Sequence, residues 1–393
     1  MSWPRVVVAG GSIGGLTAAV LLRDLGCEVD VYERSAGVLE DRGAGIVVLP
    51  VTERYFTERA GDEGRVSLEL TYWTYVDREG KVISADPDYF RFSGWATIYR
   101  ALLDVFGPER YHLGHEMVGF DRHADRVVAR FDNGVSAEGD LLVCADGLHS
   151  TARAVLLPGV EPEYSGYVAW RGTTPEAGLS AQARVDLADS MIYQVLDPGH
   201  ILVYAIPDHQ GRTSPPHRVI NWVWYRNYPR GGVFEDLMLD RDGVPRAGTM
   251  PPGMMSDDHL AEMRATAAVV LAPTLQEVVL GCERPLIQAV FDLDSPQMAF
   301  DRVCLIGDAA FGLRPHVAAG QAKACADAWA LRDALERSDG RVEEALAAWE
   351  LTQLALGRHA LERTRRMGAA SQFEGTMTPG DPAWKFGLWE PGN

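Results

Sequence analysis

Cysteine is scarce in this sequence, and the few cysteines follow no pattern of a disulfide framework or a zinc site. Only five occur among 393 residues, far apart and mostly inside apolar segments. Long apolar runs are also missing, so no membrane-spanning helix is expected. The first residues enter a strand-like run at once, without the pattern of a signal peptide. These features favour a cytoplasmic protein with buried, reduced thiols and no bound metal.

Positive charge is in short supply as well. The chain has 37 lysines and arginines against 55 aspartates and glutamates, a formal net charge of −18. So acidic a balance argues against binding to nucleic acid and to anionic membranes. The length exceeds one ordinary compact core and predicts two domains. The acidic surface, together with an extended C-terminal tail expected over 371–393, permits a homodimer without requiring one.

The first 33 residues indicate a strand, a helix and a second strand. Three consecutive valines predict a buried strand over 5–9, and apolar spacing that ends before Gly26 predicts a helix over 13–25. A second strand over 28–33 completes the start of a parallel sheet. Further apolar segments predict strands over 140–145 and 302–306 and helices over 96–106, 149–156, 319–335 and 342–367.

The middle of the chain is different in character. Turn signals predict hairpins around Gly80 and Gly134, and the aromatic, β-branched stretch 164–225 predicts an antiparallel sheet. The fold class expected is therefore α/β with an α+β second domain: a Rossmann-like parallel sheet interleaved with an antiparallel, substrate-binding sheet. The parallel-sheet domain is expected to comprise 1–70, 96–163 and 286–370, and the substrate-binding domain 71–95 and 164–285, with an extended tail at 371–393.

Six residues that span the turn after the first strand and the start of the first helix form a glycine-rich motif, Gly10-Gly11-Ser12-Ile13-Gly14-Gly15. Its first glycine permits a tight turn, its small third residue lets the backbone approach a pyrophosphate, and its last glycine allows close packing of helix on strand. A carboxylate at the end of the second strand can bind ribose hydroxyls. This context predicts an adenine dinucleotide, although the glycines alone could serve a turn. The expected contacts are Gly10, Ser12, Ile13, Gly14, Gly15, Glu33 and Arg34.

Two later segments separate FAD from NAD. Residues 143–150 read Val-Cys-Ala-Asp-Gly-Leu-His-Ser, and residues 304–310 read Cys-Leu-Ile-Gly-Asp-Ala-Ala; each ends an apolar strand. With the glycine-rich motif, they have the order and spacing of the single-component FAD-dependent aromatic hydroxylases, the family of para-hydroxybenzoate hydroxylase. The chain resembles this family over nearly its whole length. The resemblance implies FAD as cofactor, bound by the parallel-sheet domain, which is thus the expected FAD-binding domain. It also implies NADH or NADPH and O₂ as co-substrates, and hydroxylation through a flavin C4a-hydroperoxide.

The same resemblance implies roles for individual residues. Asp308 corresponds to the aspartate that binds the FAD ribitol and pyrophosphate, and Asp146 to one that serves both FAD and NAD(P)H. Arg100 falls where the family often places an arginine near the phosphates. The segment Gly43 to Ile46 resembles the loop beside the flavin, and the run after Pro315 resembles the loop at the flavin pyrimidine edge, where Ala322 replaces the usual asparagine. The implied contacts are Gly45, Val47, Arg100, Asp146, Asp308, Pro315, Gly320 and Ala322.

The residue types alone leave simpler interpretations of these positions open. Asp308 could cap a turn, and Asp146 could form an Asx-turn. Arg100 could be a solvated residue on a helix. The departure at Ala322 leaves side-chain contacts to the flavin in doubt there, whereas the helix start can still present N–H groups.

Phrases outside the FAD motifs, among them residues 106–112, 166–172 and 386–388, resemble a narrower group that hydroxylates dihydroxypyridines. The resemblance implies an electron-rich aromatic or N-heteroaromatic ring similar to 2,6-dihydroxypyridine as substrate. A hydroxybenzoate, a polyketide phenol, or a non-catalytic flavin-binding regulator remain alternatives, because substrate-contacting side chains change easily on one fold. FAD enzymes that act on isoprenoids tend to have long apolar segments, which this sequence lacks.

Hydroxylation requires an activated ring, and therefore a proton acceptor in a dry pocket. His316 follows Pro315 in the loop expected beside the flavin, and histidine titrates near neutral pH. We therefore expect His316 to be the catalytic base or a substrate contact, although it could only hold its loop. Tyr193, Tyr204 and Tyr225 are further candidate substrate contacts that could equally be packing residues of the sheet.

Overall fold

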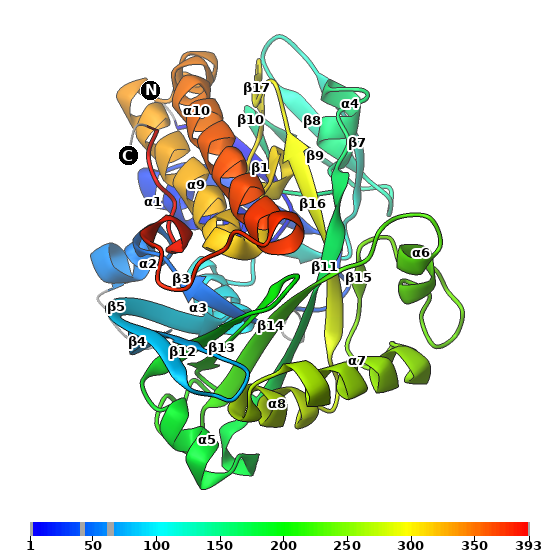
Figure 1. Ribbon diagram of the computed structural model, residues 1–393. Coiled ribbons are helices and arrows are strands. Elements are labelled where there is room, and N and C mark those ends of the chain that lie inside the picture. Colours follow the sequence, from blue (N-terminus) through cyan, green and yellow to red (C-terminus); the bar gives the residue numbers. More distant parts are fainter. Residues whose placement is uncertain (1–2, 40–43, 61–66, 392–393) are drawn as a thin grey trace.

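The computed structural model describes residues 3–39, 44–60 and 67–391. Figure 1 shows two layers of structure that share the chain, with the first and last thirds building one and the middle building most of the other. None of the helices among the described residues combines the length and the apolar character that crossing a membrane requires.

A six-stranded sheet forms the first layer, in the order β17-β18-β10-β1-β2-β6. All neighbours in it run parallel except β17 and β18. The strands are β1 (Arg5–Ala9), β2 (Glu28–Glu33), β6 (Tyr111–Leu113), β10 (Leu141–Cys144), β17 (Ala299–Phe300) and β18 (Val303–Leu305). Its helices are α1 (Ile13–Leu25), α2 (Pro50–Tyr55), α3 (Trp95–Phe106), α4 (Thr151–Leu156), α9 (Ala319–Arg337) and α10 (Val342–Ala369).

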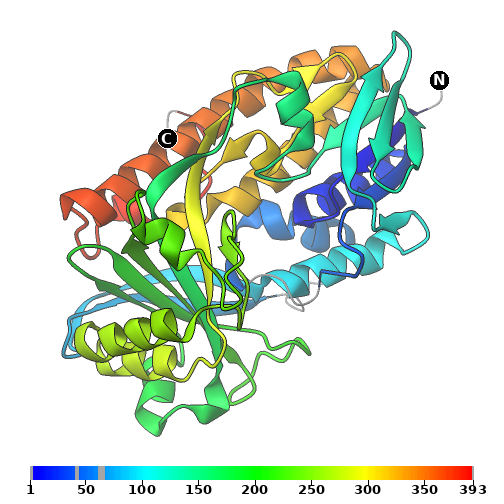
Figure 2. The same ribbon diagram turned by 90° about the vertical axis from the view of Figure 1, so that its right-hand side faces the viewer.

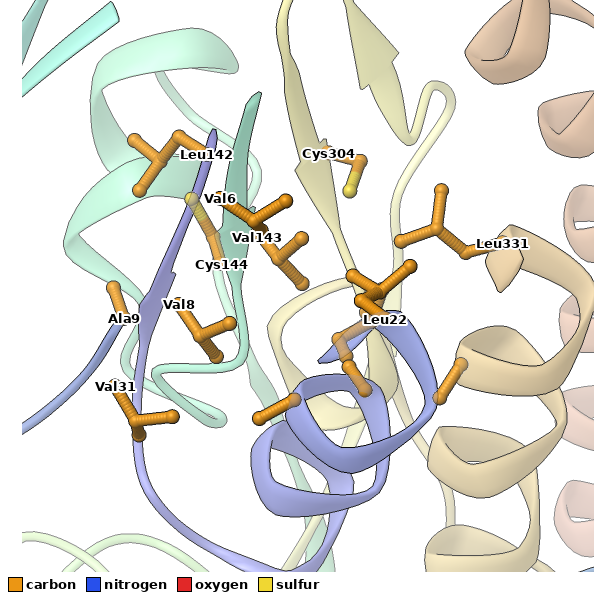
Figure 3. Close-up of a cluster of buried hydrophobic side chains, with 14 of the residues drawn as sticks. Val6, Val8, Ala9, Leu22, Val31, Leu142, Val143, Cys144, Cys304 and Leu331 are labelled. Atoms are coloured by element: carbon orange, nitrogen blue, oxygen red, sulfur yellow. The ribbon is translucent and has the colours of Figure 1, made fainter. Parts of the chain in front are cut away.

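The core of this layer lies between the sheet and the helices α1 and α9. Val6 and Val143 point from neighbouring strands toward Leu22 of α1, and Leu331 of α9 lies beside them (Figure 3). All four side chains are fully buried or nearly so. The valine runs that predicted buried strands are thus covered by helices, as a parallel sheet requires.

A ten-stranded sheet forms the second layer, in the order β15-β16-β11-β14-β13-β12-β4-β5-β3, with β19 paired to β16. Its pairs are antiparallel apart from β12 with β4. The strands are β3 (Gly45–Val48), β4 (Leu68–Val76), β5 (Val82–Gly94), β11 (Glu163–Pro175), β12 (Ser190–Val195), β13 (His200–Ile206), β14 (Val219–Asn227), β15 (Thr249–Met250), β16 (Leu286–Asp294) and β19 (Phe311–Gly312). Figure 2 shows helices on its far side: α5 (Ala181–Asp186), α7 (Asp257–Val270) and α8 (Pro273–Leu280), with α6 (Val233–Leu237) near its edge.

Smaller elements complete the fold. A three-stranded sheet comprises β7 (Met117–Arg122), β8 (Val127–Phe131) and β9 (Ser136–Gly139). Short turns of 3-10 helix occur at Glu176–Gly178, Gly307–Ala309, Pro315–Val317 and Pro382–Trp384, and π-helical turns at Phe56–Ala60 and Ala370–Glu374.

The predicted fold class is confirmed: a Rossmann-like parallel sheet is interleaved with a largely antiparallel one. The division into domains stays a prediction, and the strand pairing bears on its boundaries. The strands β3 and β16 lie in segments assigned to the FAD-binding domain, yet both pair within the ten-stranded sheet. The helices α7 and α8 were not predicted, because α7 buries only Met263 and Ala267 and so has little apolar periodicity.

Candidate active site

A cavity of about 360 Å³ lies where the two sheets meet. One end is lined by the β1–α1 turn and by residues that follow β10 and β18, which are neighbouring strands of the parallel sheet. The other end is lined by strands of the antiparallel sheet and by the start of α9. Ligands of parallel α/β sheets bind at this edge, beyond the carboxyl ends of the strands. We call these two parts the glycine-rich end and the aromatic end.

The glycine-rich turn is shaped by backbone contacts that leave no room for larger residues. Gly10 has φ +104°, and a Cβ there would lie 2.2 Å from the carbonyl oxygen of Ala145. A Cβ on Gly15 would lie 1.9 Å from the oxygen of Gly10. Ser12, Ile13, Gly14 and Gly15 line the cavity, so the amino terminus of α1 directs its free N–H groups into it. The turn therefore suits a bound diphosphate.

Glu33 is buried behind this turn. Its carboxylate accepts hydrogen bonds from the backbone N–H of Gly11 and of Ser35, each at 2.9 Å. It does not line the cavity, and the following Arg34 is exposed. The carboxylate therefore fixes the turn, and ribose binding by Glu33 and a cofactor contact by Arg34 stay predictions.

Asp146 and Asp308, the aspartates of the two later motifs, lie in the loops that follow the neighbouring strands β10 and β18. The side chain of Asp308 is exposed to the cavity, and the surrounding protein raises its pKa to about 6 by desolvation. Asp146 accepts a hydrogen bond from the N–H of Ala152 at 3.2 Å, and burial raises the pKa of its carboxyl. Arg153 joins the loops by donating to the carbonyls of Leu148 and Ala309, at 2.6 and 3.0 Å.

A buried ion pair lies behind Asp308. The N–H of Gly307 donates to Asp327 at 2.9 Å, and the other oxygen of that carboxylate is paired with Lys323, one helical turn earlier in α9. Both side chains of the pair are fully buried. Because an unpaired charge there would be costly, the pair fixes the loop that presents Asp308 to the cavity.

The start of α9 offers hydrogen-bonding groups that no atom of the described residues satisfies. Both amide atoms of Gln321 are buried without a partner among the described residues, and Gln321 lines the cavity. No atom of the described residues outside its own helix backbone lies within 4 Å of the Cβ position of Gly320, so the backbone there is open to a ligand. Pro315 lines the cavity too, whereas Ala322 is buried in the core and does not. An open backbone beside an unpaired amide suits a flat ring with donors and acceptors along its edge, as in FAD.

The loop around Gly45 is held by side chains of the antiparallel sheet. Asn221 accepts from the N–H of Gly45, and Arg171 donates to its carbonyl oxygen, each at 2.7 Å. Gly45 and Val47 line the cavity as expected. Arg100 does not line it and donates to the carbonyl of His209 at 3.0 Å. Gly43 lies outside the described residues.

The aromatic end brings together all four predicted substrate contacts. Tyr193, Tyr204 and Tyr225 lie on the adjacent strands β12, β13 and β14, and each is at most 2% exposed. They line the cavity with His316, whose ring centroid lies 4.4 Å from that of Tyr225. The sheet register places these side chains on one face, which accounts for their meeting despite wide separation in sequence.

His316 has one satisfied and one free ring nitrogen. Its Nε2 lies 2.7 Å from the hydroxyl of Tyr167, and its Nδ1 is buried without a partner in the described chain. Burial, and then the nearby His200 and Arg314, hold the pKa of His316 well below its usual value. The imidazole is therefore neutral at neutral pH, and its free nitrogen can form a hydrogen bond with a bound ligand.

A second histidine behind this wall was not predicted from the sequence. His200 contacts the hydroxyl of Ser371 at 2.5 Å through Nδ1, and its Nε2 has no partner among the described residues. Its ring stacks on Tyr193, with centroids 5.5 Å apart. Burial lowers the pKa of His200 to about 3, so it is neutral. No local motif marks His200, and only strand pairing brings it to the site.

Other site residues also escaped prediction. Arg171, Asn221 and Phe386 lie in separate parts of the chain and meet only through sheet pairing and the packing of the tail. Gln321 lies in the run after Pro315 that resembles the flavin loop, but its neighbours Gly320 and Ala322 were the predicted cofactor contacts. Its amide was the one local signal that could have been used, since a buried amide requires partners.

Comparison with known proteins agrees with this geometry. A family profile described as FAD binding domain-like matches residues 164–292. The 2,6-dihydroxypyridine 3-monooxygenase of Paenarthrobacter nicotinovorans is 36% identical over 385 residues, which cover 98% of this chain and 96% of that protein. A 3-amino-4-hydroxybenzoate 2-monooxygenase of Streptomyces platensis is 27% identical over 383 residues, covering 93% and 88%.

A solved structure supports the same relationship. The structure of 2,6-dihydroxypyridine-3-hydroxylase from Arthrobacter nicotinovorans superposes with a TM-score of 0.93 at 35% identity and covers 99% of both chains. An identity of 36% over nearly the full length of both proteins shows common family membership. The chain therefore belongs to the FAD-dependent aromatic hydroxylases, the family of para-hydroxybenzoate hydroxylase, and is a flavoprotein monooxygenase.

Proposed function

We propose that this enzyme hydroxylates 2,6-dihydroxypyridine or a closely similar hydroxylated N-heteroaromatic ring, with NADH or NADPH and O₂ as co-substrates. One observation carries the proposal. At the aromatic end, Tyr193 Oη and His316 Nδ1 line the cavity and are both buried without partners in the described chain. Unpaired buried polar groups are costly, so they favour a ligand that supplies the missing hydrogen bonds. A flat ring with two hydroxyl groups and a ring nitrogen offers such bonds.

Relatives give independent support for this substrate class. The protein from Paenarthrobacter nicotinovorans that is 36% identical is named for 2,6-dihydroxypyridine, and a 26% identical protein of Bordetella bronchiseptica is named 6-hydroxynicotinate 3-monooxygenase. Both names describe hydroxylation of a pyridine ring that already has a hydroxyl group.

The chemistry that FAD supplies when bound is activation of O₂ for transfer of one oxygen atom to the ring. His316 accepts a proton, or a hydrogen bond, from a ring hydroxyl at Nδ1, which raises the electron density of the ring. This role needs the tautomer with the proton on Nε2, which then donates to Tyr167 Oη at 2.7 Å. Tyr193, Tyr204 and Tyr225 are buried around this point. Such a wall of buried aromatic side chains limits the access of water to the hydrogen bond between His316 and the ring.

The cation that lines the cavity has both of its terminal nitrogens engaged. Arg171 is the only lysine or arginine among the residues that line the cavity within the described ranges. Its two terminal nitrogens donate to Gln288 and to the carbonyl of Gly45, each at 2.7 Å. Only its Nε is buried without a partner in the described chain, so a carboxylate on the ring would lack the bidentate guanidinium partner that such groups favour, and a hydroxypyridine suits this end better than a hydroxybenzoate does.

Product analysis under ¹⁸O₂ tests the proposal. We expect the yellow protein, NADH or NADPH, and 2,6-dihydroxypyridine to yield a trihydroxypyridine with one ¹⁸O atom. Oxidation of the reductant without a labelled product would contradict the proposed substrate, and a labelled product from a hydroxybenzoate or another phenol would replace it. Absence of turnover with every ring would favour the flavin-binding regulator.

A cytoplasmic location stays a prediction, which the five buried cysteines without disulfide bonds support. We leave homodimerisation as a prediction as well, to be tested by light scattering of the purified protein.

A further inference from the structure

The last residues of the chain pass across the aromatic end of the cavity. Phe386 lines the cavity and is 6% exposed. Its ring lies 4.8 Å from that of Trp73 in β4 and 5.3 Å from that of Phe90 in β5, centroid to centroid. Figure 1 shows this red segment running from the end of α10 back past β3. We call residues 382–390 the C-terminal strap.

The strap is anchored by a buried arginine of α10. Arg363 is 4% exposed and donates to the carbonyl of Gly387 at 2.7 Å and also to that of Lys385. Its guanidinium lies 3.5 Å from the ring centroid of Trp389. A buried guanidinium is costly without such partners, so these bonds hold the strap firmly against α10.

Two further bonds fix the strap relative to the site. The N–H of Gly387 donates to the carbonyl of Val317 at 3.0 Å, next to His316. Lys385 pairs with Asp88 of β5 at 2.7 Å. Gly387 has φ +150°, and a Cβ there would lie 2.4 Å from Nε1 of Trp389, so this position requires glycine. Phe386 is thus held between two anchored neighbours.

From these contacts we infer that Phe386 is a specificity-determining residue, a fixed part of the wall that limits the size of the ring bound at the aromatic end. The inference rests on the proposed function, since it concerns the same pocket. A phenyl ring anchored on both sides cannot move aside for a larger ligand, and the size of an apolar wall sets which ligands fit. Loss of the ring leaves space that a second fused ring can fill.

Dissociation constants for matched pairs of rings test the inference. Absorbance titration of the yellow protein would use two pairs, each a single ring and its fused analogue with the same hydroxyl positions. The first pair is 2,6-dihydroxypyridine and 1,3-dihydroxyisoquinoline, and the second is resorcinol and 1,3-dihydroxynaphthalene. In the wild type we expect the single ring of each pair to bind more tightly. Phe386→Ala is expected to shift this preference roughly tenfold or more toward the fused rings, and Phe386→Trp to shift it the other way. Leu388→Ala, in the strap but not lining the cavity, should keep the wild-type ratio.

A second readout separates failure of this inference from failure of the proposed function. Acrylamide quenching of flavin fluorescence needs no substrate and should increase in Phe386→Ala but not in Leu388→Ala. If the wild type binds resorcinol but not the pyridine, the proposed substrate is wrong and the ratio within the phenol pair still tests Phe386. If no ring binds to the wild type, the comparison of flavin quenching in Phe386→Ala and Leu388→Ala tests the inference by itself. Unchanged ratios and unchanged quenching in Phe386→Ala, with FAD content and melting temperature preserved, would overturn the inference.

Discussion

The two ends of the cavity are built in different ways. At the glycine-rich end, backbone atoms and helix termini form the surface, and glycines are required because a Cβ would overlap a neighbouring backbone. At the aromatic end, side chains from β12, β13, β14, the loop after Pro315 and the strap form the surface, and polar atoms of two of them, Tyr193 and His316, have no partner among the described residues. Cofactor recognition is therefore local in sequence, whereas substrate recognition depends on tertiary packing.

This difference predicts that substitutions at the two ends have separable effects. Changes at the glycine-rich end should remove FAD, and changes at the aromatic end should leave FAD bound and alter hydroxylation.

The largest effect is expected for Gly15→Ala. A Cβ there would lie 1.9 Å from the Gly10 oxygen, so the turn must shift, at about 3 kcal/mol or more. We expect the variant to be purified without FAD, or with FAD affinity reduced more than about 100-fold, as measured by flavin absorbance after dialysis. The control is Gly178→Ala, where no neighbour in the described part of the chain lies within 4 Å of the Cβ position. Full retention of FAD by Gly15→Ala would disprove the steric explanation.

His316→Gln is expected to have the next largest effect. Loss of a proton acceptor typically costs about 10²–10⁴-fold in rate, while FAD content should match that of the wild type. Since burial holds the pKa of His316 well below its usual value, wild-type hydroxylation should persist below pH 6.5, where an exposed histidine would be protonated. The exposed His123 gives the control variant His123→Gln. Wild-type turnover and coupling in His316→Gln would exclude the assigned role.

Tyr167→Phe tests whether the second nitrogen of His316 needs its partner. One hydrogen bond of 2.7 Å is lost, worth about 1 kcal/mol, so we expect roughly fivefold slower hydroxylation. The hydroxyl also stabilises a protonated imidazole, and its loss should move the acid limb of the rate–pH profile to lower pH. A purely packing role would lower stability and leave that limb in place.

The smallest effect is expected for Asp308→Asn and concerns the stability of the fold. This variant tests a side chain at the glycine-rich end, which is otherwise built from backbone. The pKa of Asp308 is raised to about 6 in the folded protein, above its unfolded value near about 3.9. Its stabilising contribution is therefore complete below pH 4 and lost as pH rises through 6. The contribution is under about 1 kcal/mol, because solvent in the cavity screens an exposed carboxylate. Melting temperatures of the FAD-free protein from pH 4 to 8 should show a weaker pH dependence in the variant, and identical curves would contradict this role.

The parts of the fold that could be predicted from the sequence are those with strong local patterns. Consecutive valines and the glycines around α1 located the first strand–helix–strand unit with its observed bounds. The helix α7 has little apolar periodicity and could not be found in this way. His200 and Asn221 reach the site through the register of β13 and β14, which no local pattern encodes. Phe386 reaches it through a tail whose composition suggested only an extended segment.

Anaerobic rapid mixing tests most directly whether the aromatic end and the glycine-rich end form one reaction centre. The yellow protein would be mixed with NADH or NADPH, with and without 2,6-dihydroxypyridine, while the flavin absorbance is followed. We predict that the pyridine strongly accelerates loss of the flavin band, and that His316→Gln, which still contains FAD, shows a weaker acceleration. An equal rate with and without the pyridine, in a wild type that contains FAD, would contradict binding of this ring at the aromatic end.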